Sequence, residues 1–368
     1  MSSLPLVAHA SPDSIVAWRA DGAVTLRQFL AEVRQLAALF PAGSQLLNMC
    51  SDRYRFSVGL AAAIVAGKVS LLPPTPTPEV VRQIKVFAPD AFCLTDSASC
   101  TVDLPQLQYP VMGLSRAGAV AVPQIDGKQR IAVLFTSGST GIPQPHPKTW
   151  AALVSCVQAE ALRLGLLRHT PCTIVGTVPP QHMYGFESTV LMPWHSGNAL
   201  SHAQPFYPAD ICQALAAVPA PRVLVSSPVH LRALLDAGLA LPEVALVLSA
   251  TAPMPARLAQ DIETRCQAPL MEIYGSTETG QIATRRPTQS AEWRLLPGIR
   301  LIVEGDCVRA CGGHVETMTA MSDVIEPVTD EHFLLHGRID DMVNIADAVY
   351  LVNHIFQGGP APMICYRY

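Results

Sequence analysis

Charged residues are scarce in this sequence of 368 residues, where aspartate, glutamate, lysine and arginine together make up 15%. The 25 lysines and arginines are scattered, which argues against a nucleic-acid-binding face or a polybasic membrane patch. Hydrophobic residues make up 49%, the opposite of the balance found in disordered chains. The composition therefore predicts a buried core, with room for roughly two or three globular units or one large domain with subdomains.

The sequence also lacks a segment typical of membrane insertion or export. Its longest apolar stretch, Val58 to Gly67, is about half of what a membrane span needs. Ala8, His9 and Ala10 have the small-x-small arrangement of a signal-peptidase site, but no basic region precedes them and the apolar run there is too short. We therefore expect a cytoplasmic protein without a membrane span.

The cysteines show no repeating spacing. All ten lie between Cys50 and Cys365 and predict reduced, mostly buried thiols rather than a disulfide framework. Cys307, Cys311 and His314 form a C-x3-C-x2-H cluster that raises the question of zinc. Because the cluster lacks a recognisable fourth ligand, a hairpin between two strands is the favoured interpretation.

Helical and strand-like patterns alternate along most of the sequence. Apolar spacing predicts helices at 26–36, with Thr25 as the cap, and at 56–65, 79–86, 150–162 and 228–237. Short apolar runs predict strands at 69–72, 91–94, 131–135, 172–178, 222–225 and 245–248. This alternation is typical of a largely parallel α/β architecture with ligands at the strand ends. From about Trp293 onward, strands predicted at 299–304, 307–310 and 333–335 indicate a smaller β-rich subdomain.

A dense run of hydroxyl and glycine residues follows the strand predicted at 131–135. Backbone N–H groups and hydroxyls in such a run are available to bind an anion, typically phosphate. A Walker loop is excluded because no G-K-[ST] sequence follows. For this segment alone, a phosphate-binding loop and a surface turn are equally good interpretations. The run consists of Thr136, Ser137, Gly138, Ser139, Thr140 and Gly141.

Two further segments favour the phosphate-binding interpretation. Residues 274–280, Y-G-S-T-E-T-G, follow an apolar strand and supply an aromatic ring, hydroxyls and one carboxylate. Asp323 precedes Arg338, which lies in the sequence G-R-I-D-D, by a fixed interval. Each segment alone also fits a turn, a strand end or a solvated charge pair. The three segments in this order make a specific pattern.

The pattern resembles the signature motifs of the adenylate-forming superfamily, which includes acyl- and aryl-coenzyme A synthetases, nonribosomal-peptide adenylation domains and firefly luciferase. The family's phosphate loop, [ST]-S-G-[TS]-T-G-x-P-K, is similar to residues 136–143, and its Y-G-x-T-E motif to residues 274–278. Its G-D and G-R-x-D-D motifs are similar to Ser322-Asp323 and to residues 337–341.

Weaker similarity extends the resemblance over roughly residues 15–345. Residues 179–185 resemble a P-x-x-H-x-x-G segment around His182, and residues 249–253 an S-G-G-A-P strand end. The resemblance implies an α/β fold, the N-terminal domain of an adenylate-forming enzyme. Such a domain has two α/β subdomains around parallel-type sheets and a smaller β-rich subdomain shaped as a distorted barrel.

The resemblance also implies a nucleotide site. Residues 136–141 would hold the β- and γ-phosphates of ATP. Ala250, Thr251 and Tyr274 would frame the adenine, with the Tyr274 ring stacked on the base. Gly275, in the same motif as Tyr274, belongs to this nucleotide-binding set.

The catalytic groups are implied in the same way. Thr277 would reach the α-phosphate, and Glu278 would bind Mg²⁺. Asp323 would accept hydrogen bonds from the ribose hydroxyls, and Arg338 would add positive charge near ribose and phosphate. His182 would be a gate and polar wall beside the substrate carboxylate, with a buried, hydrogen-bonded histidine as the alternative.

The implied chemistry is an in-line displacement, in which the carboxylate of an acid attacks the α-phosphorus and pyrophosphate leaves. Because that carboxylate is already ionised at neutral pH, the site must supply positioning and charge stabilisation rather than a general base. A plain aryl or fatty acid is favoured, since we identify no aspartate where amino-acid-activating members bind an α-amine. The acid pocket would be lined by His182, Gly185, Phe186, Ser227, Pro228 and Ser249.

The sequence departs from the family pattern in the phosphate loop, after the hinge motif, and at Gly358 to Tyr368, which is rich in glycine and proline and does not predict a packed ending. Gln144 stands where the family has its phosphate-loop lysine, and Lys148 could partly replace that cation. Asp340 matches the family's hinge residue, after which a C-terminal domain supplies a lysine to the substrate carboxylate and α-phosphate. Residues 346–368 contain no lysine and lack the family's next motif, G-x-R-I. We therefore expect an AMP-binding domain over 1–336, with a hinge motif and truncated remnant over 337–368.

Three functions stay open. The leading one is an AMP-dependent acid ligase, which would pass its acyl group to coenzyme A or to an acyl-carrier-protein thiol and would be slowed by the missing lysine. A second is a non-catalytic nucleotide- or acyl-binding protein. A third is an adenylation subunit that needs a separate C-terminal lid. Turnover distinguishes them, because Glu278 and Asp323 would serve binding in every case.

Overall fold

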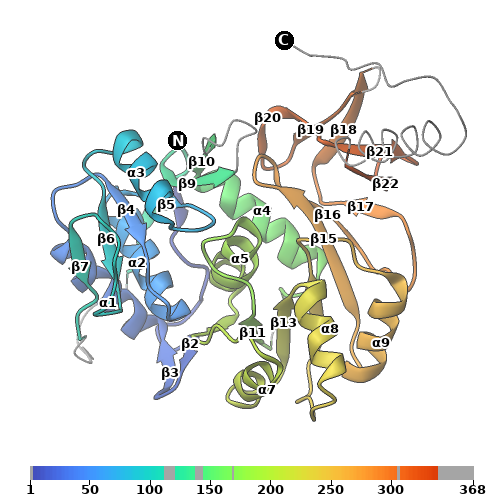
Figure 1. Ribbon diagram of the computed structural model, residues 1–368, viewed down its shortest axis with the longest axis horizontal. Helices are drawn as coiled ribbons and strands as arrows, with labels where there is room; N and C mark the ends of the chain where they lie inside the picture. Colours follow the sequence, from blue (N-terminus) through green and yellow to red (C-terminus); the bar gives the residue numbers. More distant parts are fainter. Residues whose placement is uncertain (1–2, 112–120, 137–143, 168–169, 305–306, 339–368) are drawn as a thin grey trace, which may run out of the picture.

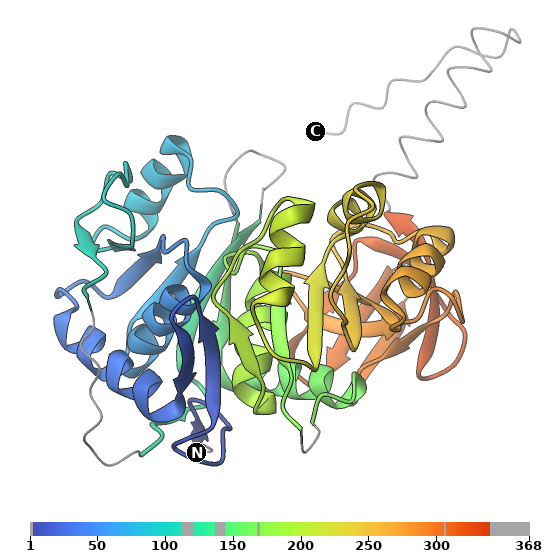
Figure 2. The same ribbon diagram turned by 90° about the horizontal axis from the view of Figure 1, so that it is seen from below.

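Two large β-sheets and the helices packed on them form the body of the molecule (Figure 1). The computed structural model describes residues 3–111, 121–136, 144–167, 170–304 and 307–338. Figure 2 shows the N-terminal part of the chain in blue and teal, the central part in green and yellow, and the β-rich part in orange and red, following one another across the molecule. A short pair of strands, β1 (Ser3–Pro5) and β8 (Gln124–Asp126), lies outside the large sheets.

The first large sheet has six strands in the order β10-β9-β5-β4-β6-β7. Its neighbours are parallel except at the edge, where β10 pairs antiparallel with β9. The chain runs from β4 to β5 on one side and then to β6 on the other, so the carboxyl end of β4 is a topological switch point. The strands are β4 (Gln45–Asn48), β5 (Val69–Leu72), β6 (Phe92–Thr95), β7 (Gln106–Gln108), β9 (Arg130–Thr136) and β10 (Gln144–Thr149).

The second large sheet has eleven strands in the order β21-β22-β17-β16-β15-β14-β13-β11-β12-β2-β3. The stretch from β2 to β15 is parallel, and the strands from β15 to β21 pair antiparallel. Its parallel part contains β2 (Ile15–Arg19), β12 (Ala199–Ser201), β11 (Thr173–Gly176), β13 (Arg222–Ser226), β14 (Leu246–Ser249) and β15 (Leu270–Ser276). The remaining strands are β3 (Gly22–Thr25), β16 (Gly280–Arg285), β17 (Trp293–Leu295), β21 (Asp323–Pro327) and β22 (His332–Arg338).

The helices follow the burial that their sequences predict. Helix α1 (Leu26–Leu39) begins at a capping box between Thr25 and Gln28 and buries one apolar stripe. Helix α2 (Arg53–Val65) is buried on nearly all sides, as expected for a helix whose residues are apolar all round. Helix α4 (Trp150–Arg163) packs on both β10 and β16 and so joins the two sheets. The others are α3 (Pro78–Phe87), α5 (Met183–Phe186), α6 (Met192–Ser196), α7 (Pro208–Ala216), α8 (Pro228–Asp236) and α9 (Ala256–Cys266).

A smaller antiparallel subdomain follows β16, as the sequence predicts. Strands β18 (Ile299–Glu304), β19 (Cys307–Gly312) and β20 (Val315–Ala320) form a three-stranded sheet. The β19–β20 hairpin contains Cys307, Cys311 and His314, which confirms the hairpin interpretation of that cluster.

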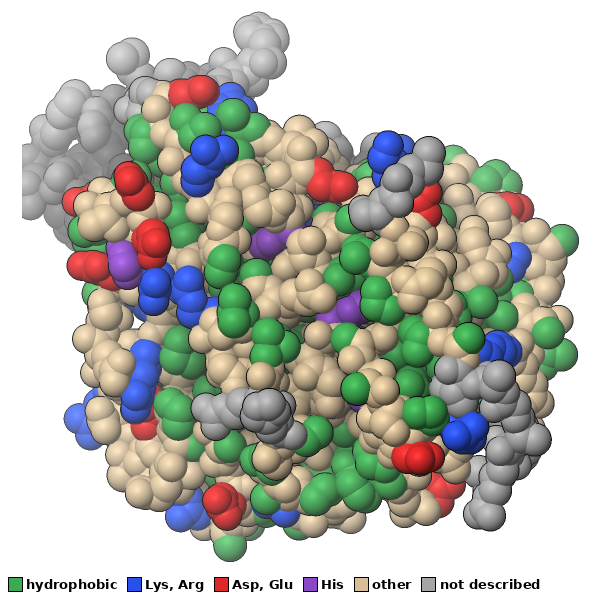
Figure 3. All heavy atoms as spheres, turned by 180° about the vertical axis from the view of Figure 1, so that it is seen from behind, with side chains coloured by type: hydrophobic (Ala, Val, Ile, Leu, Met, Phe, Trp, Pro, Cys, Tyr) green, Lys and Arg blue, Asp and Glu red, His purple; other side chains and the backbone are tan. Residues whose placement is uncertain are grey.

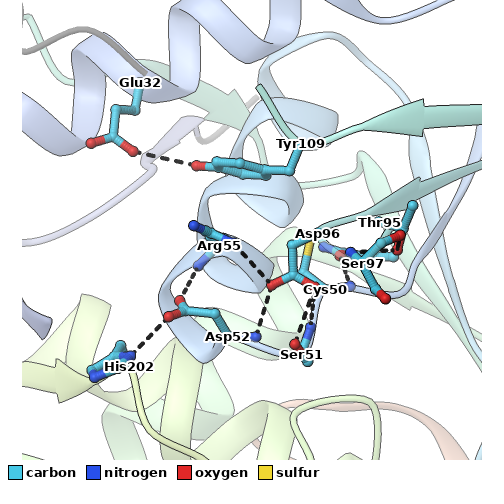
Figure 4. Close-up of polar contacts among 11 residues, drawn as sticks. Glu32, Cys50, Ser51, Asp52, Arg55, Thr95, Asp96, Ser97, Tyr109 and His202 are labelled. Carbon is cyan, nitrogen blue, oxygen red and sulfur yellow. Dashed lines mark hydrogen bonds and ion pairs between the residues drawn. The ribbon is translucent and has the colours of Figure 1, made fainter. Parts of the chain in front are cut away.

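A polar cluster joins the first sheet to the second at the carboxyl ends of β4 and β6 (Figure 4). The Asp96 carboxylate accepts hydrogen bonds from the backbone N–H groups of Ser51 (2.9 Å) and Asp52 (3.1 Å). Asp52 caps α2 and pairs with His202, which follows β12 of the second sheet, at 2.8 Å. The neighbouring Arg53 is fully buried and donates to the carbonyl oxygens of Gly176 and Val178 and to the hydroxyl of Thr189. We call the set Asp52, Arg53, Asp96 and His202 the junction cluster.

The predicted helices and strands are confirmed to within a few residues, but the sequence did not predict two important elements. One is β10, an edge strand that contains Pro145 and Pro147. The other is the π-helix η1 (Glu187–Leu191), which continues α5 into α6. Among the described helices, none is long and apolar enough to cross a bilayer. On the face drawn in Figure 3, side chains of both charges are interspersed.

Candidate active site

The two sheets meet where β10 of the first contacts the β15–β16 turn of the second. Thr136 is the last residue of β9, and the phosphate-loop sequence begins with it. The Thr136 hydroxyl lies 2.8 Å from His146 Nε2 on β10, and His146 Nε2 lies 3.4 Å from Glu278 Oε1. The structure therefore brings the start of the loop motif and the Y-G-S-T-E motif together, across 142 positions of sequence (136 to 278).

A tight hairpin between β15 and β16 presents Thr277 and Glu278 at its tip. The side chains of Ser276 and Thr279 close this turn, since each accepts a hydrogen bond of 3.2 Å from the backbone N–H of the other. Gly280 has a left-handed φ of +73°, and a Cβ there would lie 2.9 Å from Glu187 Oε1. Glycine is therefore the residue that this turn requires. As a result the Glu278 side chain points outward and remains 41% exposed.

Strand β10 directs alternate side chains toward this hairpin. His146 lies beside the Glu278 carboxylate, and Lys148 Nζ donates to the main-chain oxygen of Glu278 at 3.0 Å. Burial lowers the pKa of His146, while the charge of Glu278 opposes that shift. Burial also lowers the pKa of Lys148, against the charge of the buried Glu187. Lys148, which the sequence suggested as a partial replacement for the phosphate-loop lysine, is thus hydrogen-bonded to the Glu278 backbone.

A polar cavity of about 120 Å³ lies behind Glu278, between β10, α4 and the β19–β20 hairpin. Its wall includes Lys148, Glu187 and His314, whose Nε2 is buried and has no hydrogen-bond partner in the described part of the chain. Burial and the charge of Lys148 lower the pKa of His314 to about 4. Burial raises the pKa of Glu187 to about 7, so this carboxyl is only partly ionised near neutral pH. The sequence did not single out this buried group.

A second buried carboxyl lies close to Glu187. Glu160 on α4 is fully buried, and burial together with the charge of Glu187 raises its pKa to about 8. The Ser188 hydroxyl donates to Glu160 Oε1 at 2.9 Å. One end of the Gln281 amide lies 2.8 Å from Ser188 Oγ, and the other end lies 3.0 Å from Glu160 Oε1. Since both carboxyls sit inside helices of mixed composition, no sequence pattern marked them.

The Glu278 site fits magnesium bound together with a nucleotide. In the described ranges, no group of three or more histidine, cysteine, aspartate or glutamate side chains is placed to hold a metal ion. Magnesium at phosphate sites is usually held by one or two carboxylates, by the substrate phosphates and by water. One exposed carboxylate beside Thr136, where the expected phosphate-loop sequence starts, meets that description, so the donor set fits Mg²⁺ carried by ATP.

The residues expected around ribose and adenine lie at the next strand ends. Tyr274 Oη donates to Asp323 Oδ2 at 2.7 Å. The Tyr274 ring packs against the rings of Trp293 and Phe333, at centroid distances of 5.5 and 5.7 Å. Gly275 follows in β15 and is exposed. The structure therefore brings Tyr274 and Asp323 together, with the ring partly enclosed by the β-rich subdomain.

Ala250 and Thr251 follow β14 at the same edge of the sheet. Ala250 is buried, and Thr251 is exposed with a φ of +79°. A β-branched residue in this left-handed region is uncommon and strained. The family pattern S-G-G-A-P has glycine at the position of Thr251, which agrees with the backbone conformation found here. Ser249 is buried at the end of β14.

His182 lies at the N-terminus of α5 and is exposed. Its exposure argues against the alternative of a buried, hydrogen-bonded histidine, although the surrounding atoms desolvate the ring and lower its pKa. Gly185 packs so closely on the Pro179 carbonyl that a Cβ would lie 2.0 Å from that oxygen, and Phe186 is fully buried. Ser227 and Pro228 begin α8, where the Ser227 hydroxyl lies 2.9 Å from His230 Nδ1.

Several predicted site residues lie outside the described residues. Arg338 ends β22 opposite Asp323, but its side chain is not described. Residues 339–368, with the hinge residue Asp340, are not described either. The same holds for the loop residues Ser137, Gly138, Ser139, Thr140 and Gly141.

His146 is the site residue that sequence reasoning missed. A signal was present, because Gln144, His146 and Lys148 alternate with two prolines and so share one face of an extended strand. Two prolines in five residues argued against a strand. They fit here because β10 is an edge strand, where a missing N–H can face away from the sheet.

Comparison with known proteins gives one family and a consistent fold. The family described as "AMP-binding enzyme" matches residues 6–308. A 4-coumarate–CoA ligase of Rhodobacter capsulatus is 30% identical over 227 residues, covering 61% of this chain and 56% of that protein. A 4-coumarate–CoA ligase of Halorhodospira halophila is 31% identical over 255 residues, covering 67% of this chain and 61% of that protein. The chain thus spans 56–61% of the length of these two relatives.

Solved structures share the fold at lower identity. The o-succinylbenzoate CoA synthetase of Bacillus subtilis with its acyl-adenylate intermediate has a TM-score of 0.77 and 17% identity, covering 93% of this chain and 79% of that one. The same synthetase with ATP and magnesium ion has a TM-score of 0.74 and 18% identity, covering 90% of this chain and 78% of that one. The α/β fold with a small antiparallel subdomain is therefore that of these synthetases.

Proposed function

Because the chain belongs to the AMP-binding enzyme family, we propose that it uses ATP and Mg²⁺ to convert a carboxylic acid into an acyl-adenylate. The contact from Thr136 through His146 to Glu278 carries the proposal. It sets a half-exposed carboxylate beside the strand end from which the phosphate-loop sequence starts. A site for phosphates and their metal ion needs this combination.

The chain's own residues then have distinct tasks. Glu278 would hold the metal ion, which neutralises phosphate charge, and Thr277 would reach the α-phosphate from the same turn. Asp323 would orient the ribose, with Tyr274 donating a hydrogen bond to its carboxylate. His182, exposed at the start of α5, would wall the acid carboxylate. Positioning of this kind, together with charge stabilisation, lowers the barrier of an in-line attack at phosphorus.

The acid and the thiol acceptor follow from relatives. Since two matching relatives are 4-coumarate–CoA ligases, we propose an aryl acid, with a fatty acid as the next choice, and coenzyme A as acceptor. An acyl-carrier-protein thiol is the other acceptor that we propose to test. We also propose a cytoplasmic location, supported by the absence of a disulfide between any two of the described cysteines.

We further propose that residues 1–336 form the AMP-binding domain and that residues 337–368 contain the hinge motif. In the family, a C-terminal domain follows that hinge and contributes a lysine. Activity that appears only when such a domain is added as a separate protein would identify an adenylation subunit.

The test is acid-dependent exchange of pyrophosphate into ATP, with aryl and fatty acids and Mg²⁺. We expect exchange with a subset of aryl acids and a loss of about 100-fold or more in Glu278→Ala. Glu243→Ala, which removes an exposed glutamate elsewhere, is the matched control and should keep full exchange. ATP binding without exchange of any acid would instead favour a nucleotide-binding protein, and no ATP binding at all would refute the proposal.

A further inference from the structure

Strand β10 contacts Glu278 at two separate points. His146 lies beside its carboxylate, with Nε2 3.4 Å from Oε1, and Lys148 Nζ lies 3.0 Å from its main-chain oxygen. The two side chains are two positions apart in a strand, so they point to the same face. Pairing with β9 and the fixed φ of Pro145 and Pro147 keep this face in place.

His146 Nε2 is hydrogen-bonded to Thr136 and lies within ion-pair distance of Glu278. Nε2 faces two oxygens, Thr136 Oγ1 at 2.8 Å and Glu278 Oε1 at 3.4 Å. An ionised carboxylate only accepts hydrogen bonds, so an imidazole with its proton on Nε2 is the form that satisfies Glu278. The ring is well covered, with a side-chain exposure of 17%, whereas the Glu278 side chain is 41% exposed. A held donor thus faces a carboxylate that is otherwise free to rotate into solvent.

The Lys148 contact fixes the other half of the same residue. Lys148 is 9% exposed and reaches the Glu278 carbonyl from inside the protein. Ser276 and Thr279 close the turn with hydrogen bonds of their own, so the backbone of the hairpin tip is held by both sets of contacts. The Lys148 ammonium group therefore contacts the backbone that carries the Glu278 carboxylate, and it lies away from open solvent.

We propose that His146 and Lys148 are positioning residues that hold Glu278 in the orientation for metal binding, His146 through the carboxylate and Lys148 through the main chain. The inference rests on the proposed function, in which Glu278 binds Mg²⁺ carried by ATP. It also bears on Gln144, which stands where the family has its phosphate-loop lysine. Where the family places a lysine on the phosphates, this chain uses the next two inward-facing residues of the strand to prepare the metal ligand.

The experiment is Mg²⁺-dependent ATP binding, measured by calorimetry at fixed ATP while Mg²⁺ is varied. His146→Phe keeps an aromatic ring and removes the polar nitrogen beside Glu278, and it should weaken the apparent Mg²⁺ affinity by about tenfold or more, as loss of a polar partner of a metal ligand does. ATP binding in EDTA should stay unchanged. His146→Gln, which restores a donor near the Nε2 position, should recover most of the affinity.

A double-mutant cycle separates positioning from direct contact with the nucleotide. In a Glu278→Gln background, His146→Phe should add no further loss, because its effect passes through the carboxylate. An equal loss in both backgrounds would overturn the proposal, as would unchanged Mg²⁺ affinity in folded His146→Phe. Should His146→Phe fail to fold, His146→Leu carries the same prediction.

Failure of the proposed function has a different signature. If the unaltered chain shows no Mg²⁺-dependent ATP binding, the proposed function fails and the positioning roles fail with it. If the unaltered chain binds and the His146 variants bind equally well, only the positioning roles fail. For Lys148, Lys148→Met should weaken Mg²⁺ affinity and Lys148→Arg should retain it, while equal affinities for the two would contradict the role.

Discussion

Two polar clusters join the large sheets, and they treat their carboxylates differently. In the junction cluster, Asp96 accepts two backbone hydrogen bonds and one from the Ser51 hydroxyl, and Arg55 lies 3.6 Å away. Its side chain is 3% exposed. At the candidate site, the Glu278 side chain is 41% exposed and has the His146 ring at 3.4 Å as its neighbour. The protein itself occupies the acceptor sites of the Asp96 carboxylate, whereas the Glu278 carboxylate keeps acceptor sites open to a ligand.

The number of acceptor sites that the protein leaves open distinguishes a structural carboxylate from one able to bind a ligand. A carboxylate whose acceptor sites are all filled by the chain stabilises the fold and has little capacity left for metal or phosphate. A carboxylate on a tight turn, supported from one side, is ready to bind a cation. Removing the first kind should cost stability, and removing the second kind should cost binding.

Substitution of Arg53 should cause the largest loss of stability in the junction cluster. Arg53→Leu leaves the carbonyl oxygens of Gly176 and Val178 without their donor, so we expect a loss of about 3 kcal/mol or more in the free energy of unfolding. Urea unfolding followed by circular dichroism measures it. Arg55→Leu, at a side chain 39% exposed, is the matched control with an expected loss of about 1 kcal/mol or less. Equal losses for the two variants would contradict the structural role of Arg53.

Glu160 is a buried carboxyl that is paired with no lysine or arginine of the described residues. Its pKa is raised from the ordinary value of 4.5 to about 8, so the folded state keeps a proton that the unfolded state releases. Stability should therefore fall as pH rises from about 4.5 to about 8. Glu160→Gln should raise the free energy of unfolding at pH 8 by roughly 2 kcal/mol and change it much less at pH 5. Thermal unfolding of both proteins at the two pH values measures this difference. An equal effect of Glu160→Gln at pH 5 and pH 8 would contradict the raised pKa of Glu160.

Substitution of Thr251 tests how much the left-handed backbone conformation at this residue lowers stability. Because glycine adopts its φ of +79° without strain, Thr251→Gly should stabilise the chain by about 1 kcal/mol. Gln267→Gly, at a φ of +51°, should gain less, since an unbranched side chain fits that region better. Loss of stability in Thr251→Gly would mean that the threonine side chain makes a contact worth more than the strain.

Sequence reasoning reached most of the fold because periodicity and caps are local signals. The cap residue Thr25 and the apolar run before Thr136 predicted a helix and a strand correctly. It missed β10 because its two prolines usually end strands, and only the sheet order shows that this strand lies at an edge. The junction cluster could not be predicted either, since Asp52 and His202 are 150 positions apart and no pattern links them.

At the site, the motifs identified Glu278, Tyr274 and Asp323, and the structure places Tyr274 and Asp323 in contact. The partner of Glu278 was not predicted, because a histidine between two prolines carries no recognisable motif. Its role depends on which residue the β15–β16 turn brings to it, and that is a property of the folded chain.

The most direct test of the contrast between the two clusters is the thermal unfolding of three proteins with and without Mg·ATP. We predict that the unaltered chain and Asp96→Asn gain the same stabilisation, about 2.7 kcal/mol at a ligand concentration 100 times Kd. Asp96→Asn should start from a lower midpoint, whereas Glu278→Gln should start near the midpoint of the unaltered chain and gain almost nothing. A gain in Glu278→Gln equal to that of the unaltered chain would contradict the account.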